Sequence, residues 1–190
     1  MKAAPAANNA VRLAKSEDLP TWGQIQAQAM QADLQSHLGQ VGPQTLALID
    51  PQQIPRAWEQ ALENPPSPKH HLLSAVSAGQ VVGLAAIAPA PKMLVQPKQS
   101  PLAEKSADAE IVALEVDDWE RNLADASRLV NAVADMLRMS GATRVQIWLA
   151  AQAQEKIRFF SESGFVPAGL RQGLQVGRQS MVQHLWFTDM

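Results

Sequence analysis

The feature that most constrains the fold is a strand, a helix and a second strand that follow one another over residues 110–150. The runs Glu110 to Val116 and Val145 to Ala150 are apolar and short, as buried strands are. Between them, Asp125 to Met139 carries apolar residues at helical spacing, with Asp125 as a candidate cap and Gly141 as the stop. A helix that connects neighbouring strands in this way makes them parallel. The fold therefore contains a parallel crossover.

The remaining segments add antiparallel strands and further helices. Residues 71–76 and 80–88 are β-rich and separated by Ser77-Ala78-Gly79, which predicts a hairpin. Other predicted strands are 10–15, 181–187 and an extended segment from Phe165, and other predicted helices are 20–38, 54–62 and 154–163. We expect an α/β (α+β) fold, with a mixed, mostly antiparallel twisted sheet and helices on both faces. A flavodoxin-like domain is the alternative, and the hairpin argues against it.

Composition limits the chemistry that the chain can perform. Its 190 residues predict a single domain over 1–190, with residues 1–9 flexible and 89–107 an exposed loop. The net charge of −2 favours no nucleic-acid partner, and no apolar run is long enough for a membrane helix. The N-terminal residues lack the apolar core of a signal peptide, so a cytoplasmic protein is expected. Because the chain has neither Cys nor Tyr, no thiol or phenol takes part in catalysis.

The order of the motifs between Glu110 and Phe165 is more specific than any one of them. The first strand ends in Leu114-Glu115-Val116, and the loop Arg121-Asn122-Leu123-Ala124-Asp125-Ala126 leads to helical Ser127-Arg128-Leu129. The last helix carries the aromatic pair Phe159-Phe160 shortly before Gly164-Phe165. In this order the segments resemble the core of the GNAT superfamily of N-acetyltransferases. Val81-Val82-Gly83 and Val11-Arg12-Leu13-Ala14 extend the resemblance over nearly the whole chain.

The resemblance implies an acetyl-CoA-dependent N-acetyltransferase. In this family two parallel strands splay apart around the pantetheine arm of acetyl-CoA, which predicts backbone contacts from Leu114 and Val116. The pyrophosphate is expected at the following helix N-terminus, where free N–H groups attract anions. The residues expected there are Arg121, Asn122, Leu123, Ala124, Asp125, Ala126 and Ser127. The acceptor would be a small-molecule or protein amine, and a homodimer is a frequent assembly in the family.

Two positions depart from the family pattern. Ala124 replaces a glycine, and Asp125 adds a carboxylate that can cap the helix and repel a pyrophosphate. Either the cap weakens CoA binding, or Arg121 and Arg128 compensate for the charge. Phe160 stands where many members have a tyrosine acid, and it is either a core aromatic or a wall of the thioester pocket.

Glu115 is the candidate general base. Strict alternation places it on one face with Ile111 and Ala113, opposite Val112, Leu114 and Val116. A carboxylate in an apolar strand needs a partner or a function, so an ion pair with an arginine is the other interpretation. His70 and His71 point to opposite faces, His184 suits a surface position, and no cluster has metal-ligand spacing. We therefore expect no metal.

The resemblance also suggests three candidates for acceptor binding, because the first helices often border the acceptor site in this family. Trp22, Met30 and Trp58 could line an acceptor pocket, but ordinary packing is the favoured interpretation. The leading hypothesis is an N-acetyltransferase. The alternative is a non-catalytic GNAT-fold protein for ligand binding or interaction that has lost CoA binding, since Ala124, Asp125 and Phe160 depart together.

Overall fold

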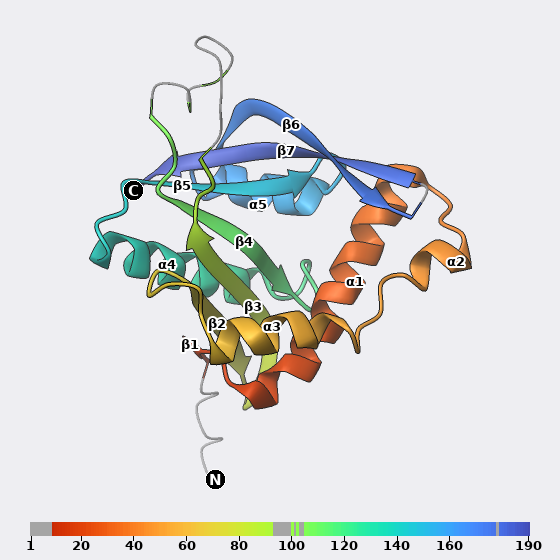
Figure 1. The fold of residues 1–190 in the computed structure, drawn as a ribbon, viewed down its shortest axis with the longest axis horizontal. Coiled ribbons are helices and arrows are strands. Elements are labelled where there is room, and N and C mark those ends of the chain that lie inside the picture. Colours follow the sequence, from red (N-terminus) through yellow and green to blue (C-terminus); the bar gives the residue numbers. More distant parts are fainter. Residues whose placement is uncertain (1–8, 93–99, 101, 103–104, 178) are drawn as a thin grey trace, which may run out of the picture.

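A computed structural model describes residues 9–92, 100, 102, 105–177 and 179–190 (Figure 1). The N-terminal half contains β1 (Ala10–Leu13), the short 3-10 helix η1 (Ser16–Asp18), α1 (Leu19–Leu38), α2 (Pro43–Leu46), α3 (Ile54–Glu63), β2 (His71–Ser77) and β3 (Gln80–Pro89). The C-terminal half contains β4 (Ala109–Val116), α4 (Leu123–Met139), β5 (Arg144–Ala150), α5 (Gln154–Glu162), β6 (Val166–Val176) and β7 (Gln179–Asp189). The predicted strand–helix–strand unit is thus β4, α4 and β5.

The strands form one seven-stranded sheet in the order β1-β2-β3-β4-β5-β7-β6. Among the strand pairs of the described residues, only β4–β5 is parallel, because α4 connects these two strands as a crossover. Every other neighbouring pair is antiparallel. The prediction of a mixed, mostly antiparallel sheet is confirmed.

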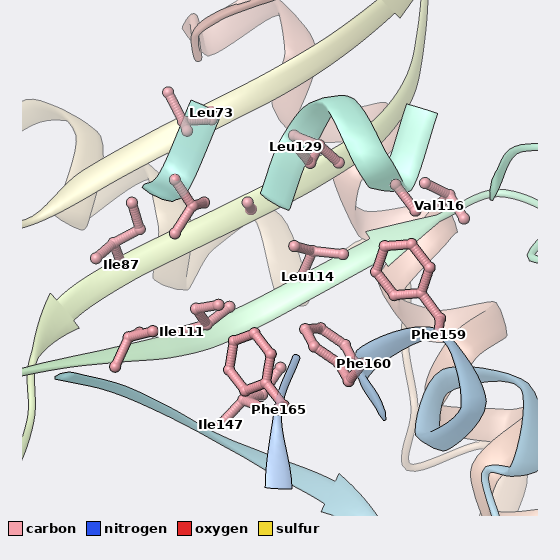
Figure 2. Close-up of a cluster of buried hydrophobic side chains, with 14 of the residues drawn as sticks. Leu73, Ile87, Ile111, Leu114, Val116, Leu129, Ile147, Phe159, Phe160 and Phe165 are labelled. Atoms are coloured by element: carbon pink, nitrogen blue, oxygen red, sulfur yellow. The ribbon is translucent and has the colours of Figure 1, made fainter. Parts of the chain in front are cut away.

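Helices cover both faces of this sheet (Figure 1). On one face α4 and α5 pack on the central strands around Leu114, Leu129 and Phe160 (Figure 2). On the other face α1 and α3 pack on β3 through a cluster that includes Trp22 and Leu84. Gly83 lets α4 approach closely, since a Cβ there would lie 2.9 Å from the Glu115 carbonyl oxygen and 3.1 Å from Leu129.

β4 carries a β-bulge at Val112. Ala86 of β3 pairs with Ala113, and the next residue, Ile87, pairs with Ile111, so Val112 has no partner of its own on β3. The bulge brings Ile111 to the face of Leu114 and Val116, as Figure 2 shows. The prediction that Ile111 shares a face with Glu115 is therefore wrong, because the extra residue of the bulge interrupts the alternation of side chains.

The predicted loop 89–107 is partly packed against the sheet. Residues 93–99, 101 and 103–104 of this segment, like residues 1–8, lie outside the described residues. Of the rest, Ser100 and Leu102 are buried, and Leu102 packs against Ala168, Leu185 and Phe187. Among the described residues, no helix combines the length and the apolar character needed to cross a bilayer.

A buried carboxylate connects the start of the chain to the sheet. Asp18 is 3% exposed and accepts hydrogen bonds from both terminal nitrogens of Arg12, at 2.6 and 2.8 Å. It also accepts bonds from the Ser74 hydroxyl at 2.8 Å and the Lys15 backbone N–H at 2.9 Å. Burial alone would raise the pKa of Asp18, but these bonds outweigh it and hold the pKa below its ordinary value.

Asp18→Ala is expected to lower the free energy of unfolding by about 3 kcal/mol, because it leaves the Arg12 guanidinium and the Ser74 hydroxyl without their partner. A urea-unfolding midpoint measures this loss. Since the folded-state pKa is depressed, the stabilisation is present at neutral pH and disappears as the pH falls through that pKa. The control is Glu17→Ala, whose exposed pair with Lys15 at 3.4 Å contributes less than about 1 kcal/mol. Equal losses in the two variants would contradict the prediction.

Candidate active site

The parallel strands β4 and β5 separate beyond the bulge. Ladder pairs join Ala109 to Val145, Glu110 to Gln146 and Ile111 to Ile147. Although β4 continues to Val116 and β5 to Ala150, these described residues form no further pair between the two strands. A bulge bends and twists its strand, so we attribute the separation to Val112. The gap holds a cavity of about 200 Å3, lined by both strands, α1, α5, β6 and β7.

Three charged side chains from different elements meet at this gap. Lys156 of α5 places its Nζ 2.8 Å from Glu115 Oε1 on β4 and 2.9 Å from Asp33 Oδ2 on α1. Their side chains are 9%, 15% and 18% exposed, respectively. The Trp119 indole donates a further hydrogen bond of 3.0 Å to Glu115 Oε2. With one ammonium and two carboxylates, this cluster carries a formal charge of −1.

The surroundings shift the proton affinities of this cluster. Burial raises the pKa of Glu115, and the neighbouring Asp33 carboxylate acts in the same direction, although Lys156 opposes both. Burial acts to lower the pKa of Lys156, but the two facing carboxylates outweigh it and raise that pKa. Glu115 is therefore a stronger base than an exposed glutamate, and Lys156 stays an ammonium ion.

A second cavity lies on the other border of the cluster. It has a volume of about 310 Å3 and is lined by α1 together with Trp119 and residues 152–156. Asp33 and Lys156 line both this cavity and the one in the gap. These two charged side chains therefore stand between the two cavities, and Glu115 borders only the cavity in the gap.

The N-terminus of α4 follows the end of β4 after a short loop. Asp118 shapes that loop, because its Oδ1 accepts hydrogen bonds from the backbone N–H groups of Glu120 at 3.0 Å and Arg121 at 3.1 Å. The helix begins at Leu123 with Asn122 as its N-cap residue. The N–H groups of Leu123 and Ala124 have no acceptor among the described residues. They remain available to an anion.

Asp125 does not cap this helix, contrary to the prediction from the sequence. It lies in the first turn, two residues inside the start, and its buried carboxylate pairs with Arg128 one turn further on. The helix starts earlier than predicted because Asn122 and the Asp118 turn already lead the chain into it. Arg128 thus neutralises Asp125 locally, and the terminal N–H groups are left free.

The sequence model of the acetyltransferase (GNAT) family matches residues 40–165, which is more than half of the chain. The chain belongs to the GNAT family. No curated protein sequence matches it. Membership makes the chain a GNAT N-acetyltransferase, a class that uses acetyl-CoA.

Solved structures of other GNAT proteins have the same fold. A ribosomal-protein-alanine N-acetyltransferase from Brucella melitensis is 19% identical with a TM-score of 0.65, covering 95% of this chain and 99% of its own. An N-acetyltransferase from Staphylococcus aureus Mu50 gives 19% identity and a TM-score of 0.65, with coverages of 96% and 98%. The PaiA N-acetyltransferase from Thermoplasma acidophilum, solved with coenzyme A, gives 11% identity and a TM-score of 0.60, and the match covers 96% of this chain and 99% of that one. At these identities the likeness establishes the fold alone.

The structure of this GNAT protein places the predicted site residues in two groups and leaves one apart. Glu115 lies at the gap, while the neighbouring side chains of Leu114 and Val116 are buried in the core. The second group surrounds the α4 N-terminus and comprises Arg121, Asn122, Leu123, Ala124, Asp125, Ala126 and Ser127. Within it, Asn122 donates to Asp117, Arg121 is 84% exposed beside Asp118, and Ser127 donates to the Leu123 carbonyl.

Phe160 stands apart from both groups. It is fully buried and packs edge-on between Phe159 and Phe165, at centroid distances of 5.3 and 5.1 Å (Figure 2). This placement agrees with the core-aromatic interpretation.

The sequence prediction missed two members of the charged cluster. Asp33 and Lys156 are 123 residues apart, and neither stands in a motif. A signal was present in both helices: Asp33 lies between the apolar residues Met30 and Leu34, and Lys156 lies one turn before Phe160. A charge on the buried side of an amphipathic helix marks a candidate site residue.

The other residues singled out in the sequence have ordinary environments, with one exception. Trp22 donates to Ser74 at 3.0 Å and Trp58 to Gln26 at 2.7 Å, and the two rings pack edge-on. Met30 does line the cavity in the gap. His184 is exposed, and the described residues contain no group of three His, Asp or Glu side chains that could hold a metal.

Proposed function

We propose that this chain transfers an acetyl group from acetyl-CoA to a primary amine in the gap between β4 and β5. The observation that carries the proposal is the cavity between the separated strands, where the buried Glu115 carboxylate borders empty space. A base must lie within hydrogen-bonding reach of the proton that it removes. Glu115 is the carboxylate of β4 that lines this cavity, and its raised pKa strengthens it as a base.

The residues present suit acetyl-CoA. The free N–H groups of Leu123 and Ala124 and the positive end of the α4 dipole would hold the pyrophosphate. The backbone of β4 beyond Ile111 forms no ladder with β5, so its polar groups would hold the pantetheine amides. When bound, acetyl-CoA supplies a thioester whose carbon–sulfur bond is exchanged for a carbon–nitrogen bond to the amine.

The charged cluster supplies the proton chemistry. Of the two protons that an acceptor ammonium loses on becoming an amide, one ends on the CoA sulfur and the other leaves through Glu115 to solvent. The Lys156 ammonium would stabilise negative charge that develops at the gap, since a fixed cation in a buried site acts strongly on such charge. The chain has no tyrosine, and Phe160 is buried away from the cavity lining.

Calorimetric titration with acetyl-CoA tests the proposal. We expect wild-type binding, little change in Ala124→Gly, and equal or tighter binding in Asp125→Asn, since Arg128 already neutralises this carboxylate. Arg128→Gln is expected to weaken binding by about fivefold to tenfold, because it leaves Asp125 unpaired in the first helical turn.

The matched control is Arg138→Gln, which breaks the exposed pair with Asp135 in the last turn of the same helix. This variant should bind acetyl-CoA like the wild type. Absence of wild-type binding together with clear binding by Ala124→Gly would contradict the proposal. That outcome would identify a closed cofactor site.

One observation favours a second candidate, a GNAT-fold protein that has lost CoA binding. The Lys156 side chain reaches from α5 to both β4 and α1 and stands between the two cavities. A cofactor arm that passes between them has to share this space. Under this candidate, wild-type protein binds no acetyl-CoA, and shortening Lys156 creates binding.

A further inference from the structure

The cavity in the gap has a mostly apolar lining. Among the described residues that line it, the charged groups are those of the Asp33, Glu115 and Lys156 cluster. Besides this cluster, the lining contains the amide side chains of Gln26 and Gln183 and large apolar side chains from α1, β5, β6 and β7: Met30, Leu34, Trp148, Leu174, Val176 and Met181. Such a lining favours a ligand with an apolar body, since burial of apolar surface is its main source of affinity.

The charge at the polar end is complementary to a single cation. Asp33 and Glu115 share one ammonium, Lys156, which leaves a formal charge of −1 in a place where each side chain is at most 18% exposed. A poorly solvated surplus charge is costly unless a partner balances it. The ammonium group of an acceptor amine supplies one positive charge, and the amine nitrogen would then lie beside the base Glu115.

The same cluster disfavours an acceptor that carries a carboxylate. Among the described residues that line the cavity, Lys156 is the only cation, and both of its hydrogen-bond partners are carboxylates. The volume of about 200 Å3, which the acceptor would share with the acetyl end of acetyl-CoA, is also below the range of about 300 to 1,000 Å3 typical of pockets for drug-sized ligands. An amino acid would therefore lack a partner for its acid group, and an aminoglycoside would be too large.

We infer that the acceptor is a small monoamine with an apolar body and no acid group. Its ammonium lies beside Asp33 and Glu115, and its body contacts Met30, Leu174 and Met181. The inference rests on the proposed transferase function and names the class of its substrate.

Phenethylamine and three matched compounds test this inference. Phenethyl alcohol lacks the charge, ethanolamine lacks the apolar body, and free phenylalanine adds a carboxylate. Calorimetric titration of the protein, with and without coenzyme A, should show each of the three binding about tenfold or more weakly than phenethylamine. Equal binding of the alcohol or of phenylalanine would overturn the inference.

Two variants locate the ligand in this cavity. Asp33→Asn keeps the size of the side chain. It is expected to weaken the binding of phenethylamine about tenfold and to leave the binding of phenethyl alcohol unchanged. Leu174→Gln should weaken the binding of both compounds. Its matched control is Leu13→Gln, which changes an exposed leucine on the edge strand β1 and should leave both affinities unchanged. Unchanged phenethylamine affinity in both cavity variants would exclude this site.

Acetyl-CoA binding, measured separately, keeps the two proposals distinct. If phenethylamine is preferred but acetyl-CoA does not bind, the transferase function fails and the ligand class stands. If acetyl-CoA binds and none of the four compounds does, the ligand class is overturned and the transferase function stands.

Discussion

Glu115→Gln is expected to lower the turnover number by about 10²- to 10⁴-fold, the usual contribution of a general base, while acetyl-CoA binding stays close to that of the wild type. The carboxamide keeps the shape of the side chain and can still accept the hydrogen bond from Trp119. It cannot take the proton of the acceptor amine. Steady-state kinetics with a thiol-release assay measure the loss, and calorimetry measures cofactor binding.

The pH dependence separates a base from a merely structural residue. Because burial raises the pKa of Glu115, the acidic limb of kcat/KM should lie above the ordinary glutamate range. As the pH falls through this pKa, Glu115 becomes protonated and the rate falls. The limb should be absent in Glu115→Gln.

Glu110→Gln is the matched control for this experiment. Glu110 lies on the same strand, but on its paired part, where it accepts a hydrogen bond of 2.6 Å from Gln146. This variant should keep both the turnover number and the acidic limb. A Glu115→Gln enzyme with wild-type turnover would exclude Glu115 as the base.

The sequence was sufficient for the fold because the fold depends on regular patterns. Apolar residues at helical spacing predicted α4, and the two flanking apolar strands predicted the parallel crossover. The motif order then indicated the family, and the family model confirms it. These features depend on many residues at once, so single departures such as Ala124 did not hide them.

The site depends on features that such patterns do not report. The bulge at Val112 adds one residue to β4 and shifts its register. Since no glycine or proline in the sequence marks the bulge, the prediction from strict alternation assigned Ile111 to the wrong face. The alternative interpretation of Glu115 was an ion pair with an arginine, whereas its partner is Lys156, a lysine on α5. Asp33 and Lys156 meet only because α1 and α5 both reach the gap, which depends on tertiary packing.

Lys156→Met is expected to lower the free energy of unfolding by about 3–5 kcal/mol, the cost of leaving buried charge without its partner. Methionine fills much of the same volume, so the loss comes from the repulsion between the carboxylates of Asp33 and Glu115, which Lys156 no longer balances, and not from a cavity. Urea unfolding measures it. The control Lys105→Met breaks a half-exposed pair with Asp189 at 3.5 Å and should cost less than about 1 kcal/mol.

The charge origin of this loss can be tested within the cluster itself. The triple variant Asp33→Asn, Glu115→Gln and Lys156→Met carries no charge there and should recover most of the stability that Lys156→Met loses. In Lys156→Met, Glu115 no longer has a cation beside it, so its pKa rises further. The loss of unfolding free energy relative to the wild type should therefore grow as the pH rises and shrink in acid. A deficit that is independent of pH and persists in the triple variant would show that Lys156 acts by packing.

If Lys156→Met instead gained acetyl-CoA binding that the wild type lacks, the cluster would be a closure of the cofactor site and not a part of the catalytic machinery.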